Sequence, residues 1–190
     1  MIQDLFKTPI YTTALDIDNL SISKHCISYS KKNKGRILSN EGGYQSEDLI
    51  LSNHKILNPL VTGILEHSSI YCSEINLKCS NKIDNIWFNI NGYKDSNLLH
   101  SHPHSLISGV YYVQTPKDCG NIQFHHPGSE SFQNYWMENV GSEYNTYNSG
   151  EWWLQSTVGV MYLFPSWLKH YVRPNLNKKE KRISISFNIK

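Results

Sequence analysis

The hydrophobic pattern divides the chain into a first part that favours helices and a second part that favours strands. The clearest helix runs from Pro59 to about Cys72. There, residues with the i, i+3, i+4, i+7 spacing of one buried face recur: Leu57, Leu60, Val61, Ile64, Leu65, Ser68 and Cys72. Asn58 is placed to cap this helix, and Pro59 suits its first position, where a missing N–H costs nothing. His67 is predicted to lie on the helix surface.

The residues before this helix form shorter elements. Residues 5–15 read as an extended segment in which Pro9 marks an edge position. A short amphipathic helix is predicted from about Asp16, as the cap, to about Ser30. The glycine-containing residues 31–44 are expected to form a loop, and a helical turn is expected to begin near residues 46–50.

After residue 75 the chain consists of short runs rich in β-branched and aromatic residues, separated by Gly and Pro turns. The predicted strands are residues 75–77, 86–90, 107–113, 121–125, 152–155, 160–164, 170–173 and 182–189. No helix alternates with them, which argues against a parallel α/β sheet and favours a mainly β jelly roll with helices packed on one side. Residues 128–150 lack clear periodicity, and a loop of that length is more often functional than idle.

This pattern predicts a single domain over residues 1–190. Residues 1–80 would form a helical N-terminal support region, and residues 81–190 would form the jelly-roll core that carries the site. The length of 190 residues suits one domain with a sizeable core. Five Trp, 12 Tyr and 6 Phe supply core volume in a chain that is only 39% hydrophobic.

Charge and cysteine content exclude several classes of protein. The net charge of +2 is too small to indicate nucleic-acid binding. The four cysteines are scattered, without a CxxC pair, and the first residues lack the features of a signal peptide. They therefore read as reduced thiols of a cytoplasmic protein. No apolar run approaches the ~18 residues that a membrane span requires. The oligomeric state stays open, a dimer included.

The candidate chemistry centres on His100-Ser101-His102-Pro103-His104, directly before the strand at residues 107–113. In an extended segment, residues two apart point to the same side, so His100 and His102 can aim two ring nitrogens at one metal ion. The alternative is a partly solvated turn whose histidines are incidental. A second candidate pair, His102 and His104, also has to be considered, although Pro103 lies between them.

A third histidine and an arginine follow further along the chain. His170 opens a strand after a Pro-marked turn, and a jelly roll brings such distant strands together. In the last strand Arg182, Ser184 and Ser186 share one face, while Ile183, Ile185 and Phe187 share the other. A guanidinium inside a barrel needs an anionic partner. The carboxylate of a cosubstrate can form a bidentate pair with it, and a serine hydroxyl two residues on is a further donor. Alternatively, Arg182 belongs to the basic, solvated turn that precedes it.

The order of these motifs resembles the putative 2-oxoglutarate–Fe(II) oxygenases, which are distantly related to prolyl hydroxylases. The motifs are His-x-His, the run Ser108–Val113, the segment Phe164–Pro174 with its histidine, and Arg182–Asn188. Residues 42–46 and Trp87-x-Asn89 also match a small bacterial and phage branch of that superfamily. The resemblance covers roughly residues 40–189.

This resemblance implies a double-stranded β-helix and an oxidoreductase that uses Fe(II), 2-oxoglutarate and dioxygen on a small-molecule or side-chain substrate. Carried over by position, His100, His102 and His170 would hold the iron. Arg182 would pair with the far carboxylate of 2-oxoglutarate, with Ser184 or Tyr112 as a further donor. Trp87, Asn89 and Tyr111 are expected to line the pocket. No catalytic residue beyond the metal ligands is implied.

One departure separates this sequence from the common pattern of the superfamily. The usual ligands are two histidines and a carboxylate, and His102 stands where the acid is expected. Asp95 and Glu151 are the carboxylates considered as replacements, but their spacing selects neither. The departure keeps a second function open, a cupin-type metal-binding isomerase or small-molecule-binding domain without 2-oxoglutarate chemistry.

Overall fold

The protein consists of two antiparallel β-sheets that enclose a polar pocket. The structure is a computed structural model that describes residues 1–190, except for the side chains of Phe132 and Met137. The larger sheet has the order β1 (Tyr11–Ala14), β9 (Val160–Pro165), β6 (Ile107–Gln114), β11 (Arg182–Ile189), β4 (Ile83–Asn91) and β3 (Tyr44–Gln45). The smaller sheet has the order β2 (Asn40–Glu41), β5 (Ser96–His100), β10 (His170–Val172), β7 (Ile122–His125) and β8 (Glu151–Leu154). The predicted mainly β architecture is confirmed.

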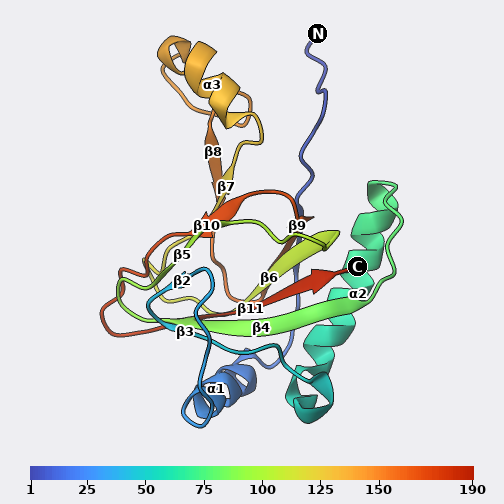
Figure 1. Cartoon of the computed structure of the whole chain (residues 1–190), viewed down its shortest axis with the longest axis vertical. Coiled ribbons are helices and arrows are strands. Elements are labelled where there is room, and N and C mark those ends of the chain that lie inside the picture. Colours follow the sequence, from blue (N-terminus) through green and yellow to red (C-terminus); the bar gives the residue numbers. More distant parts are fainter.

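The two long helices, α1 (Asn19–Ser30) and α2 (Asn58–Glu74), pack on the outer face of the larger sheet beside β4 and β11 (Figure 1). Two 3-10 turns, Leu51–Asn53 and Lys55–Leu57, lead into α2. A short helix, α3 (Ser129–Tyr135), and a 3-10 turn, Met137–Asn139, lie beyond the ends of β7 and β8. In the residues that the structure describes, no helix combines the length and apolar character needed to cross a membrane.

The alternation of side chains along β11 gives the strand one hydrophobic face and one polar face. Ile183, Ile185 and Phe187 belong to the main hydrophobic core, shared with α1 and α2. The residues between them point into the space between the sheets, where a second apolar cluster fills one end: Val110, Tyr112, Ile122, Phe124, Tyr162, Phe164 and Leu168. Both faces of β11 are buried, and its inner face is nevertheless polar. Buried polar residues are costly without hydrogen-bond partners, so this face is a candidate for ligand binding.

Both predicted helix caps are wrong. Asp18, rather than Asp16, caps α1, and its side chain accepts a hydrogen bond from the Ser21 N–H at 3.0 Å. Asn58 is the first residue of α2 and makes no cap, because the preceding 3-10 turn runs directly into the helix. Pro59 does occupy the first turn, as predicted.

The predicted strands need correction in three places. Residues 75–77 form no strand, because Ile75 ends α2 and Asn76 takes a positive φ of 52°. Strand β5 was not predicted, and the loop predicted for residues 31–44 contains β2 and the start of β3. Of the first three strands, β1 and β3 belong to the larger sheet and β2 belongs to the smaller one. The four cysteines are free thiols.

Candidate metal centre

Two of the candidate histidines face each other across neighbouring strands. His100 ends β5 and His170 begins β10, and the two are direct partners in the antiparallel register. Directly paired residues point to the same face, and the two ring centroids lie 4.4 Å apart. His170 is 4% exposed and packs edge-on against Phe164.

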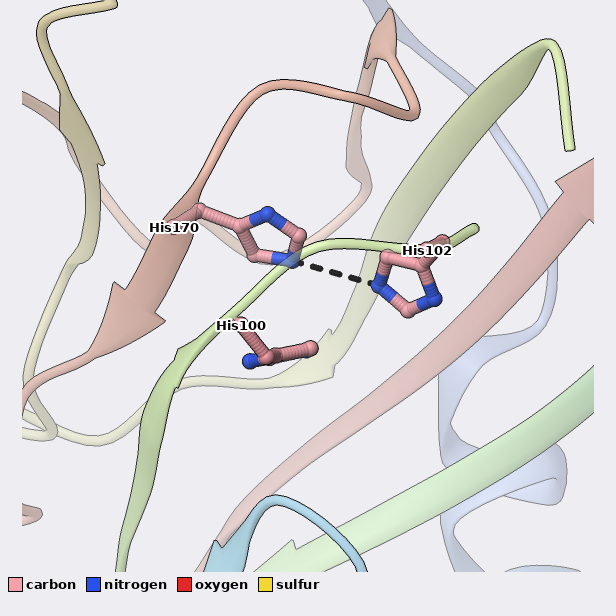
Figure 2. Close-up of side chains that lie close together, drawn as sticks. All are labelled: His100, His102 and His170. Carbon is pink, nitrogen blue, oxygen red and sulfur yellow. Dashed lines mark hydrogen bonds between the residues drawn. The ribbon is translucent and has the colours of Figure 1, made fainter. Parts of the chain in front are cut away.

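His102 reaches the same point from the loop after β5. Its backbone N–H donates to the carbonyl oxygen of Ser166 at 2.9 Å, which fixes this loop to the turn before β10. Its ring lies 5.6 Å from that of Trp87. Figure 2 shows the three imidazoles converging, with the Nε2 atoms of His102 and His170 3.4 Å apart. One ring nitrogen from each histidine lies within 4.8 Å of the others, a spacing that fits a single metal ion.

The hydrogen bonds of two rings leave the correct nitrogen free. His100 Nδ1 lies 2.6 Å from the Leu98 carbonyl oxygen, and His170 Nδ1 lies 2.9 Å from that of Leu168. A carbonyl oxygen only accepts, so Nδ1 carries the proton in both rings and Nε2 keeps its lone pair. Such a bond to the second nitrogen is the usual way in which proteins orient a histidine ligand.

Burial keeps the three imidazoles neutral. It lowers the pKa of His170 to about 3, and repulsion from His100 acts in the same direction. Burial and the same neighbour lower the pKa of His102 to about 4. The pKa of His100 is also lowered by burial, against an opposing contribution from its bond to Leu98. Neutral imidazole is the form that binds a metal, so at neutral pH none of the three rings has a positive charge to lose before binding.

The other candidate ligands lie outside this cluster. His104 is exposed and has a positive φ of 71°. Asp95 accepts a hydrogen bond from the Gly92 N–H at 2.6 Å, and Glu151 accepts one from the Tyr171 hydroxyl at 2.8 Å. Within the described residues, the cluster has no carboxylate ligand. His67 on α2 is half-buried and bonded to the Tyr11 hydroxyl at 2.9 Å.

One pocket joins the histidines to the other predicted residues. Trp87, Asn89, Tyr112, Arg182 and Ser184 line it together with the three imidazoles. The expectation for Tyr111 is wrong. That side chain points to the opposite face of β6, where its hydroxyl donates to Asn19 Oδ1 on α1 at 2.8 Å.

Arg182 is 1% exposed, so it is not part of a solvated turn. Its Nη1 donates to the carbonyl oxygens of Cys119 and Arg173, while its Nε and Nη2 are buried and have no hydrogen-bond partner among the described residues. The buried Tyr112 hydroxyl likewise has no hydrogen bond of normal geometry to the described residues, although the Ser156 side chain lies beside it. Burial raises the pKa of Tyr112 to about 12, so this hydroxyl stays a donor. Two guanidinium donors and a phenol donor without partners fit a carboxylate group.

Several polar residues near the histidines had no predicted role, and Asn188 is the one that contacts His102. Asn188, on β11, is 4% exposed, and its Nδ2 lies 3.4 Å from His102 Nδ1. The signal was present in the sequence, because Asn188 continues the every-second-residue series of Arg182, Ser184 and Ser186.

Three clustered imidazoles and a buried arginine with unpaired donors, between the sheets of a jelly roll, are typical of a metal-dependent enzyme with an anionic cosubstrate. A family described as "Putative 2OG-Fe(II) oxygenase" matches residues 85–188. The match spans more than half of the chain, so the protein belongs to this family. It is a 2-oxoglutarate- and Fe(II)-dependent dioxygenase, and the resemblance seen in the sequence is confirmed. A search of curated proteins found no match.

Solved structures of similar fold confirm the double-stranded β-helix. A Pseudomonas putida prolyl-4-hydroxylase superposes with a TM-score of 0.68 at 12% identity, over 96% of this chain and 92% of that one. A viral collagen prolyl hydroxylase from Paramecium Bursaria Chlorella virus-1 gives 0.58 at 10% identity, over 95% and 94%. HygX from Streptomyces hygroscopicus, solved with nickel and 2-oxoglutarate bound, gives 0.58 at 8% identity, over 96% and 82%.

Proposed function

We propose that His100, His102 and His170 hold the iron of this dioxygenase through their Nε2 atoms. The observation that carries this assignment is the approach of three ring nitrogens to within 4.8 Å of one another. Two of the rings have Nδ1 tied to a backbone carbonyl oxygen, which directs Nε2 to the centre. Nitrogen donors of this kind suit Fe(II) as well as Zn(II) and Ni(II).

The partner for 2-oxoglutarate in this proposal is Arg182, with Tyr112 and Ser184 beside it. Nη1 is occupied by backbone carbonyl oxygens, so the guanidinium is fixed in place while Nε and Nη2 stay free for a carboxylate. Ser184 is the direct strand partner of Tyr112, which puts both hydroxyls on the same face as Arg182. A fixed, unpaired donor set binds an anion at low reorganisation cost.

When bound, iron and 2-oxoglutarate supply oxidation by dioxygen, with decarboxylation of 2-oxoglutarate to succinate. The residues of the chain would position these two groups and shield them from water. Phe164 covers one side of His170 and Trp87 lies against His102, so both limit access of water to the centre. We propose a hydroxylation of a small molecule or a protein side chain as the outcome for the substrate.

Metal binding by single-site variants tests the ligand set. Under anaerobic conditions the wild type is expected to bind about one equivalent of Fe(II), because the three imidazoles form one site. His170→Ala removes the most buried ligand and is expected to abolish binding and succinate formation. His67→Ala, a half-buried histidine on α2, is the matched control and is expected to keep both. Equal Fe(II) affinity in wild type and His170→Ala would remove this site.

A further inference from the structure

The three rings of the proposed metal centre differ in the group that faces Nδ1. His100 and His170 each meet a backbone carbonyl oxygen two residues earlier in the chain. Among the described residues no carbonyl oxygen bonds to the Nδ1 of His102, which instead faces the Nδ2 of Asn188 at 3.4 Å. An amide nitrogen is a donor, so in this arrangement Nδ1 accepts and the proton of His102 resides on Nε2.

This tautomer suits the metal-free ring and is incompatible with metal binding through Nε2. With its proton on Nε2, His102 can donate to His170 Nε2, 3.4 Å away. A metal ion needs the Nε2 lone pair, and the proton must then move to Nδ1. Once protonated, Nδ1 needs a hydrogen-bond acceptor. The Nδ2 atom of Asn188 is a donor and cannot fill this role.

Asn188 belongs to a buried chain of groups that can each donate or accept. Its strand partners on the two sides are Asn85 and Ser108. Its Nδ2 donates to Asn85 Oδ1 at 2.8 Å, and its Oδ1 accepts from Ser108 Oγ at 2.7 Å. Ser108 Oγ also lies 2.9 Å from Ser166 Oγ. Amides and hydroxyls have both roles, so the direction of the whole chain can reverse without moving the backbone.

We propose that Asn188 is a positioning residue for His102, and that its side-chain amide turns over when the metal binds. After the turn, Oδ1 accepts from His102 Nδ1–H, and Nδ2 donates to Ser108, whose proton points to Ser166. The neighbouring Asn85 amide turns with it and donates its own Nδ2–H. Because amide oxygen and nitrogen are nearly equal in size, this changes hydrogen bonds and preserves packing. The inference rests on the proposed three-histidine centre.

The position of the proton is measured directly by ¹⁵N NMR on histidine-labelled wild-type protein. Zn(II) serves as a diamagnetic probe of the same nitrogen donors. The expected result is a His102 proton on Nε2 in the metal-free protein and on Nδ1 in the Zn(II)-loaded protein. A proton on the same nitrogen in both states would overturn the turnover of Asn188. This measurement needs no variant and so is independent of folding defects.

Zn(II) affinity of variants, from competition with a chelator, tests the positioning role. Asn188→Leu removes the acceptor and is expected to weaken binding by about 10- to 100-fold, the usual effect of losing such a partner. Asn188→Asp keeps an acceptor of the same shape and is expected to bind at least as tightly as wild type. Asn85→Ala is the matched control, since it disturbs the same network without removing the group that faces His102, and its loss is expected to be much smaller.

The outcomes separate this inference from the function on which it rests. If Asn188→Leu folds, as judged by thermal unfolding, and binds Zn(II) like wild type, the role of Asn188 is refuted while the metal centre stands. The same holds if Asn188→Asp loses as much affinity as Asn188→Leu. If wild type and His170→Ala bind Zn(II) equally, the three-histidine centre itself is refuted.

Discussion

Replacing Arg182 by lysine and by methionine separates the charge of the guanidinium from its pair of free donors. In the structure Nη1 is held by the carbonyl oxygens of Cys119 and Arg173, and only Nε and Nη2 remain for a ligand. Lysine keeps the positive charge and loses the planar arrangement of donors. Methionine keeps a similar length of apolar chain and loses both.

The size of each effect follows from the number of donors lost. A hydrogen bond to a charged group contributes about 1.5–3 kcal/mol. Arg182→Lys loses about one such bond, so 2-oxoglutarate binding is expected to weaken by about 10- to 150-fold. Arg182→Met leaves a carboxylate buried without a partner, which costs on the order of 2–5 kcal/mol, or about 30- to 4,000-fold in affinity. Binding should therefore fall from wild type to lysine to methionine.

The metal-to-ligand charge-transfer band of the Fe(II)–2-oxoglutarate complex measures this binding under anaerobic conditions. Metal content and thermal unfolding are measured for each variant, because Arg182 also pairs with backbone carbonyl oxygens and its loss affects stability. Lys169→Met is the matched control, since it removes an exposed positive charge next to His170 and no donor from the pocket. Equal affinities in wild type and both Arg182 variants, at equal metal content, would refute the assignment.

Three further predictions test the ligand set, the electrostatics and the packing. His100→Ala should lose metal and His104→Ala should keep it, because His104 is exposed and lies outside the cluster; metal loss in His104→Ala alone would mean that the ligand pair is His102 and His104. The folded-state pKa values of His100, His102 and His170 lie below the value of about 6.5 of an unfolded chain, so protons favour unfolding. The free energy of unfolding of the metal-free protein should therefore be highest above about pH 6.5 and fall as the pH falls toward 4 and 3. Between pH 7.5 and 4.5 the Tm should drop less in a variant with all three histidines replaced by alanine than in wild type. Parallel Tm curves for the two proteins would contradict this. Gly109→Ala would bring a Cβ to 2.3 Å from Phe187 Cζ and 2.8 Å from Leu163 Cδ2, so urea unfolding should report a loss of about 1–3 kcal/mol, and unchanged stability would show that the core yields there.

The alternation of residues in β11 was readable from the sequence, and it located much of the pocket. Arg182 and Ser184 lie on the inner face and the isoleucines on the core face, as the two-residue period requires. The same two-residue period also excludes one predicted pocket residue and points to one that was not predicted. Tyr111 and Tyr112 are neighbours in one strand, so both could not line the pocket, and Asn188 follows the same face as Arg182.

Other features depended on tertiary contacts that no local pattern contains. Strand β5 has the sequence Ser-Asn-Leu-Leu-His, which lacks β-branched residues, and it forms by pairing with β2 and β10. An irregular register between β5 and β10 brings both Asn97 and His100 to the pocket, so a strict two-residue period fails there. The cap of α1 was misplaced by two residues because two aspartates compete for the same start, and only the backbone geometry selects Asp18.

The most direct measurement is anomalous diffraction at the iron absorption edge, from crystals grown without oxygen and soaked with Fe(II) and 2-oxoglutarate. The account predicts one strong peak bounded by the Nε2 atoms of His100, His102 and His170, with the far carboxylate of 2-oxoglutarate on Arg182 Nε and Nη2. A peak at His104 or on the surface, or a cosubstrate whose carboxylate lies away from Arg182, would contradict it.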